Sequence, residues 1–232
     1  MKEIHIKEKL EELDHPVDQL SLGDFDQIGH FTAYKSRSPD SELYKTKGCF
    51  FRPNYERGML IYSLIRKYNV KSYLEIGFGR GYSSICAAKA MSEIGGGVIT
   101  TIDPFFDYGL WDHLCKIFPP EWTGQFEIIK DKSQDYLAKD TSSYDFIYID
   151  GDHTADAVRQ DWENTKDKYE KLLLFDDYHK QQTDSSIECS QTIDQIEDES
   201  KQLIIMDRRI FHDDRELSDD QIDYGQVLLT KK

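Results

Sequence analysis

Short apolar blocks alternate with longer polar or amphipathic stretches through the middle of the chain. The blocks are rich in β-branched and aromatic residues, which predicts strands at 73–76, 98–103, 126–129, 146–150 and 172–175. The stretches between and before them predict helices at 54–68, 83–91 and 155–169. Strands separated by helices indicate a parallel sheet that is covered by helices on both faces.

Two further apolar blocks, 203–206 and 226–230, lie close together near the C-terminus. Parallel strands need a long crossover connection, so the short connection between these blocks favours an antiparallel pair at one edge of the sheet. The sequence therefore predicts a Rossmann-like, doubly wound α/β fold. We expect a mostly parallel seven-stranded sheet with an antiparallel edge strand and helices on both faces.

The connection 104–124 between the second and third predicted strands is long and aromatic, since it contains Phe105, Phe106, Trp111 and Trp122. Long connections at the carboxyl edge of a sheet often form lids over a ligand. These side chains therefore either line a ligand pocket or pack the connection against the sheet.

The net charge of the chain restricts the classes of partner that it can bind. It carries 44 acidic and 29 basic residues, a formal net charge of −15. Such a surface repels phosphate backbones and anionic lipids, so we expect neither a nucleic-acid partner nor a membrane partner. Its four cysteines show no metal-ligand or disulfide spacing, and the first 16 residues lack the apolar core of a signal peptide. We therefore expect a soluble, cytoplasmic protein.

A glycine-rich turn directly after the first predicted strand is the strongest chemical signal. Glu75 lies within that strand, and Gly77, Gly79 and Gly81 follow at every second position. Glycines let backbone N–H groups approach a ligand, and the following helix N-terminus favours an anionic group. The spacing differs from the GxGxxG of dinucleotide sites, and an acidic residue in the strand before the turn would repel a pyrophosphate. This turn instead suits a ligand with a cationic amino-acid end.

The segment YLEIGFGRGYSS resembles motif I of class I S-adenosylmethionine-dependent methyltransferases. The resemblance implies that Glu75 helps to hold the methionine end of the cofactor, while the three glycines and Ser83 line it. Asp103, at the end of the second predicted strand, matches the acidic residue that binds the ribose hydroxyls in that family. A carboxylate is chemically suited to accept both O–H donors of a vicinal diol.

Three acidic residues, Asp150, Asp176 and Asp177, end the fourth and fifth predicted strands. The carboxyl ends of parallel strands meet in one crevice, so we expect these carboxylates to converge there. Converging carboxylates repel one another unless a cation or extra protons compensate. Ligands that offer only oxygen suit Mg²⁺ or a similar divalent ion better than zinc.

The blocks IDGDHTADAVRQDWEN and LLLFDDYHK resemble the Asp-x-x-His and Asp-Asp motifs of metal-dependent O-methyltransferases, including enzymes that act on macrolide sugars. This second resemblance implies that the three acids coordinate the metal. It also implies that His153 is the general base, with His179 as a competing candidate. We further expect Asp150 to contact the cofactor as well as the metal.

The tripeptide that starts at Ser133 and continues with Gln134 is similar to the adenine-side segment of catechol O-methyltransferase. The resemblance places both side chains near the adenine of the cofactor. Together the matching motifs span about 73–179. We expect residues 1–52 to form an N-terminal lid or interface segment and 53–232 to form the S-adenosylmethionine-binding methyltransferase domain.

These patterns predict an O-methyltransferase that uses Mg²⁺ and modifies a hydroxyl of a small acceptor, preferably a sugar and otherwise a phenol. A metal-independent enzyme in which His153 acts alone remains open, as does a non-catalytic cofactor-binding subunit. The glycine spacing disfavours a nicotinamide-dependent oxidoreductase. A homo-oligomer is compatible with the sequence, which does not identify the acceptor.

Overall fold

A computed structural model describes residues 1–14, 55–181, 187–206 and 224–231. These residues build one eight-stranded sheet with the strand order β1-β7-β8-β6-β5-β2-β3-β4. In chain order the strands are Lys2–His5 (β1), Ser72–Ile76 (β2), Val98–Ile102 (β3), Phe126–Ile129 (β4), Tyr144–Ile149 (β5), Tyr169–His179 (β6), Gln202–Ile205 (β7) and Tyr224–Thr230 (β8).

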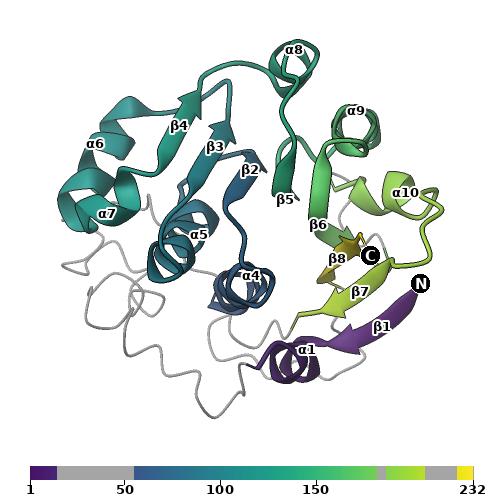
Figure 1. Cartoon of the computed structure of the whole chain (residues 1–232). Helices are drawn as coiled ribbons and strands as arrows, with labels where there is room; N and C mark the ends of the chain where they lie inside the picture. The colour runs from purple at the N-terminus through teal and green to yellow at the C-terminus, as the bar shows by residue number, and fades with distance from the viewer. Residues whose placement is uncertain (15–54, 182–186, 207–223, 232) are drawn as a thin grey trace, which may run out of the picture.

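Helices cover both faces of this sheet (Figure 1). One face carries α1 (Ile6–Glu12), α4 (Tyr55–Tyr68), α5 (Tyr82–Glu93), α6 (Tyr108–Ile117) and α7 (Pro120–Thr123). The other face carries α8 (Ser133–Leu137), α9 (Ala155–Thr165) and α10 (Cys189–Ile193). Each helical layer forms its own hydrophobic core with the sheet, so the central strands are buried on both sides.

The predicted Rossmann-like, mostly parallel fold is confirmed. Strands β4, β3, β2, β5 and β6 are mutually parallel, and β8 is antiparallel to both β6 and β7. The central strands are long enough and apolar enough to be recognised from sequence. In β5, for example, the last four residues are all buried.

The outer half of the sheet differs from the prediction. The sheet has eight strands because β1 pairs in parallel with β7, and β8 lies between β6 and β7 instead of at an edge. Residues 2–12 of the expected lid or interface segment thus form β1 and α1, and Ile4, Ile6 and Leu10 enter the core. The remainder of that segment, 15–52, lies outside the described residues.

The boundary between α9 and β6 also differs. The helix ends at Thr165 instead of 169, and β6 already begins at Tyr169. Tyr169 is buried and pairs with Tyr144 of β5, so tertiary packing extends the strand into a polar segment.

The aromatic connection after β3 folds onto the sheet. Phe106 and Trp122 are buried, and the ring of Trp111 packs against that of Phe126 at a centroid distance of 4.7 Å. Phe105 is the exception, because 90% of its surface is exposed. Of the two alternatives, packing against the sheet therefore describes most of these side chains. Phe105 instead lies exposed at the carboxyl edge of the sheet.

The strand order places a topological switch point between β2 and β5. The chain leaves β2 toward β3 and β4, then returns to β5 on the other side of β2. Ligands of open α/β sheets bind outside the carboxyl ends of the strands at such a point. The glycine turn after β2 and Asp150 after β5 both lie there.

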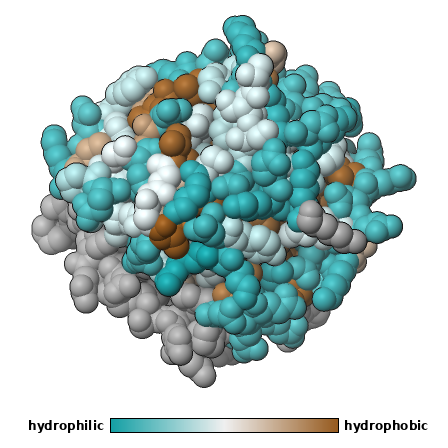
Figure 2. Space-filling view, viewed as in Figure 1, coloured by the Kyte–Doolittle hydropathy of each residue, from teal (hydrophilic) through white to brown (hydrophobic). Residues whose placement is uncertain are grey.

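The visible surface is predominantly hydrophilic, with small separate apolar areas (Figure 2). This agrees with the strongly acidic composition of the chain. Within the described segments, no helix is long and apolar enough to cross a membrane.

Candidate active site

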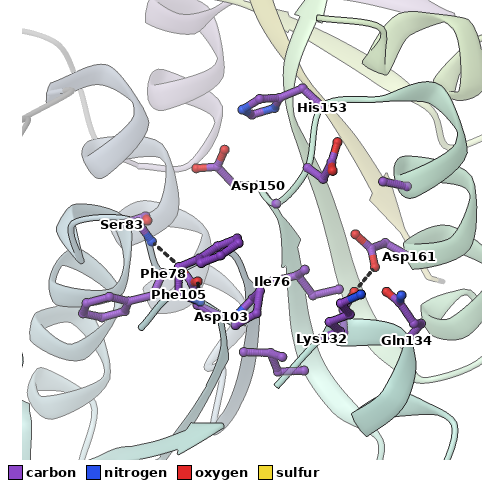
Figure 3. A pocket seen from close by; sticks show the side chains of 18 of the residues that line it. Ile76, Phe78, Ser83, Asp103, Phe105, Lys132, Gln134, Asp150, His153 and Asp161 are labelled. Atoms are coloured by element: carbon purple, nitrogen blue, oxygen red, sulfur yellow. Dashed lines mark hydrogen bonds between the residues drawn. The ribbon is translucent and has the colours of Figure 1, made fainter. Parts of the chain in front are cut away.

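A large cavity opens at the switch point, and its volume is about 1030 Å³. Cavities for small molecules commonly measure about 300–1,000 Å³, so this one has room for a cofactor and an acceptor together. In Figure 3, Asp150 and His153 lie at one end of the cavity, Asp103 and Phe105 on one wall, and Gln134 and Asp161 on the opposite wall.

The glycine turn between β2 and α5 forms the floor of this cavity. Gly77 has a φ of +92°, and a Cβ atom added there would lie 2.0 Å from the backbone oxygen of Asp150. Gly79 has a φ of +52°, and a Cβ atom added there would meet nothing within 4 Å. The first glycine therefore locks the turn against β5, and the second presents open backbone to the cavity.

Asp103 is held in place by the same turn. Its Oδ2 accepts a hydrogen bond from the backbone N–H of Gly79 at 3.0 Å, and its Oδ1 accepts one from Phe105 at 2.8 Å. A carboxylate has lone pairs to spare after two such bonds. Because Asp103 lines the cavity, those lone pairs are available to a diol, as the predicted ribose contact requires.

Glu75 lies beneath the turn and is fully buried. The hydroxyls of Ser83 and Ser84 both donate to its carboxylate. Burial raises the pKa of Glu75 to about 7, although the two serine hydrogen bonds and Arg57 act in the opposite direction. Ser83 itself lines the cavity, whereas Glu75 does not. In this structure Glu75 therefore acts on the site through the serines.

We expect Glu75→Gln to stabilise the protein at alkaline pH. The folded state holds the Glu75 proton more tightly than the unfolded chain, so ionisation penalises the folded state as pH rises from about 4.5 to about 7. The neutral variant avoids this penalty, which amounts to about 3 kcal/mol above pH 7. Thermal unfolding should show the stabilisation at pH 8 and almost none at pH 4.5. The control Glu163→Gln, at an exposed position of α9, should unfold like the wild type at both pH values. An equal shift at both pH values would contradict a buried, ionising Glu75.

The opposite wall contains the predicted adenine-side residues. Ser133 and Gln134 both line the cavity, and Ser133 Oγ donates to Asp161 Oδ1 at 2.5 Å. Asp161 comes from α9, and its burial raises its pKa to about 6. Sequence reasoning missed Asp161, although an acid on the inner face of a polar helix was a signal for it.

Asp150 and His153, at the end of the cavity, form a compact cluster with Asp177. One ligand atom from each residue lies within 4.8 Å of the other two, and His153 Nδ1 is 3.3 Å from Asp177 Oδ2. Asp177 sits at an irregularity in β6 and has a φ of +51°, which is unusual for a residue with a side chain. This backbone turn brings its carboxylate to His153.

Asp176 does not join that cluster, unlike the predicted ligand set. Its Oδ1 accepts hydrogen bonds from Tyr224 at 2.6 Å and Gln226 at 2.8 Å, and its Oδ2 forms an ion pair with Arg57. The structure thus places His153 where the sequence predicted Asp176. His179, the competing base, is buried against the ring of Tyr224 and is not among the residues that line the cavity.

Sequence reasoning also missed Arg57 of α4. Its Nη1 donates to Asp150 Oδ2 at 3.0 Å, and its Nη2 donates to Tyr224 at 3.0 Å. The available signal was a cationic residue in the first turn of a helix whose central residues are apolar. Arg57 lines the cavity, so it belongs to the site.

The pKa values of Asp150 and Asp176 are shifted in opposite directions. Burial and the negative charge of Asp176 raise the pKa of Asp150 well above its usual value, despite the nearby Arg57. Burial alone would raise the pKa of Asp176 too, but Arg57 and the Tyr224 and Gln226 hydrogen bonds hold it below its usual value. A divalent cation would stabilise the ionised form of Asp150, which burial and Asp176 disfavour. The oxygen and nitrogen donors of the cluster also suit such a cation.

Comparisons with known proteins agree with this geometry. Residues 74–178, from β2 through most of β6, match the sequence profile of a family described as a methyltransferase domain. The chain has no significant match among curated proteins.

Several solved structures share the fold. A putative caffeoyl-CoA O-methyltransferase from Staphylococcus aureus aligns with a TM-score of 0.59 and 19% identity, over 91% of this chain and 97% of that one. TomG, an O-methyltransferase from Streptomyces achromogenes solved with S-adenosylmethionine, gives 0.58 and 13%, over 92% and 100%. An O-methyltransferase from Bacillus cereus solved with S-adenosylhomocysteine gives 0.57 and 14%, over 97% of each chain.

At these identities the structural neighbours establish the fold, and the profile match identifies the domain. The residues that match a methyltransferase domain, 74–178, contain both the glycine turn and the acidic cluster. The sequence-based recognition of a class I S-adenosylmethionine-dependent methyltransferase is confirmed.

Proposed function

We propose that this protein transfers the methyl group of S-adenosylmethionine to a hydroxyl of a small acceptor, with a divalent cation held by Asp150, His153 and Asp177. The observation that carries the proposal is the cavity that joins the glycine turn to Asp150 and His153, the two residues of this cluster that line it. A sugar is the preferred acceptor and a phenol the alternative. The O-methyltransferase titles of the structural neighbours support oxygen as the methylated atom.

The cofactor would be held by the turn and both walls. Gly79 leaves open space beside its Cα, Asp103 would offer its remaining lone pairs to the ribose, and Ser133 and Gln134 would face the adenine. The sulfonium of S-adenosylmethionine supplies an activated methyl group. The protein must therefore align an acceptor oxygen and assist its deprotonation.

The acidic cluster would serve that deprotonation. A dication there supplies a positive charge that lowers the pKa of a bound hydroxyl. Asp150 and Asp177 provide the oxygen donors, and His153 provides an imidazole nitrogen. His153 has 40% of its side chain exposed, so it is reachable from the cavity.

A metal-independent enzyme is the second candidate, and one contact favours it. The 3.3 Å approach of Asp177 Oδ2 to His153 Nδ1 is also the arrangement of a base and its orienting carboxylate. In that case the other nitrogen of His153 would accept the hydroxyl proton, and Arg57 would supply a positive charge beside Asp150.

Calorimetric titration with S-adenosylhomocysteine, followed by turnover assays on hydroxylated sugars and phenols, tests the proposal. We expect binding of S-adenosylhomocysteine, loss of turnover after chelation, and recovery of turnover with Mg²⁺ or Mn²⁺. Full turnover in chelator would favour the metal-independent mechanism, in which His153 and Asp177 act as the base and its orienting carboxylate. Failure of folded protein to bind S-adenosylhomocysteine with or without Mg²⁺ would refute the proposal itself.

A further inference from the structure

Arg57 connects four elements beneath the cluster. It extends from α4, donates to Asp150 after β5, pairs with Asp176 on β6 and donates to the Tyr224 hydroxyl on β8. Only 20% of its side chain is exposed. A guanidinium is suited to this bridging because its donors point in several fixed directions within one plane.

Asp176 is the residue most affected by this arrangement. Its side chain is 1% exposed, and both of its oxygens are engaged, one by Arg57 and the other by Tyr224 and Gln226. It is adjacent in sequence to Asp177, yet only Asp177 belongs to the compact cluster. The positive φ of Asp177, at the irregularity in β6, accounts for the different directions of the two side chains.

We infer that Arg57 withholds Asp176 from the cation site and thereby sets the affinity of that site for divalent ions. Arg57 is a positioning residue in this role, because it acts through two carboxylates and not on the acceptor. The inference rests on the proposed function only in placing a divalent cation at the cluster.

The charges at the site support this role. Three carboxylates and one guanidinium leave two negative charges, which one dication neutralises. Without Arg57, the same group would carry three negative charges, and Asp176 would have an oxygen free to turn toward the cation. Both changes favour tighter cation binding.

Mn²⁺ binding by the chelator-treated protein, without cofactor or acceptor at pH 7.5, tests this role directly. We expect Arg57→Gln to bind Mn²⁺ at least about tenfold more tightly than the wild type, because it gains a ligand and loses a repelling charge. Arg57→Lys should show a smaller gain, since an ammonium cannot bridge both acids. Arg66→Gln on the same helix, which pairs with Glu93 instead, should match the wild type.

The double variant Arg57→Gln/Asp176→Asn tests whether the gain in Mn²⁺ affinity requires Asp176. It leaves two negative charges, as in the wild type, and we expect it to lose the gain in Mn²⁺ affinity. Persistence of the gain without Asp176 would overturn the inference, because Arg57 would then act through charge on Asp150 alone. Unchanged or weaker Mn²⁺ binding by folded Arg57→Gln would also overturn it. If that variant does not fold, the absence of any gain in Arg57→Lys does the same.

The outcomes distinguish this inference from the proposed function. Tight Mn²⁺ binding by Arg57→Gln together with no binding by the wild type would support the role of Arg57 and refute the native cation site. Equal binding by both proteins would preserve the cation site and refute the role of Arg57. No binding by either protein would refute both.

Discussion

Replacing Gly77 with alanine is expected to abolish binding of S-adenosylhomocysteine and to lower the free energy of unfolding by about 3 kcal/mol or more. The new Cβ would lie 2.0 Å from the Asp150 backbone oxygen, on a residue whose φ is +92°. The obstructing atom is main chain at the end of β5, so no side-chain rotation can relieve the contact. Either the turn or the end of β5 must move, and both form the cofactor side of the cavity.

Gly95→Ala is the matched control for backbone strain. Gly95 has a similar φ of +97°, but its added Cβ would approach nothing closer than Lys71 Nζ at 3.7 Å. It lies between α5 and β3, away from the cavity residues. We expect it to lose about 1–2 kcal/mol and to keep ligand binding. Calorimetry and denaturant unfolding measure both effects, and equal behaviour of the two variants would contradict the role assigned to the Asp150 contact.

The predictable part of the fold is the part buried on both faces. Strands such as β2 and β5 are short apolar runs because helices cover each side of them, so sequence alone reveals them. β1 gives no such signal, since only Ile4 of its four residues is buried. Its place beside β7 depends on long-range pairing, which local patterns do not encode.

The candidate site was predictable where its residues follow strands. The glycine turn, Asp103 and Asp150 follow the neighbouring parallel strands β2, β3 and β5, whose carboxyl ends meet at one crevice. The choice between Asp176 and Asp177 was not predictable, because it depends on a register shift in β6 and the positive φ of Asp177. Arg57 was also out of reach, because its contact with Asp150 spans 93 positions and depends on how α4 packs against the sheet.

Replacing Asp150 with asparagine is expected to reduce turnover by about 10²–10³-fold while leaving the protein folded. Asp150 contributes to the cation cluster, lines the cavity and is contacted by Arg57, so its charge bears on every group that handles the acceptor hydroxyl. Asparagine keeps the shape of the side chain and removes the charge. Cation affinity should fall together with turnover, whereas S-adenosylhomocysteine binding should change much less.

The unfolding temperature of Asp150→Asn shows whether a loss of turnover comes from the site itself or from unfolding. Burial and Asp176 raise the pKa of Asp150, so its ionised form strains the folded state, and the neutral variant should unfold at a similar or higher temperature. Arg57 retains Asp176 and Tyr224 as partners in that variant. Asp156→Asn, at an acid with an 86% exposed side chain on α9, is the control and should match the wild type in all measurements. Wild-type turnover by Asp150→Asn would remove the cluster from the mechanism, because no other described carboxylate links Arg57, His153 and the cavity in this way.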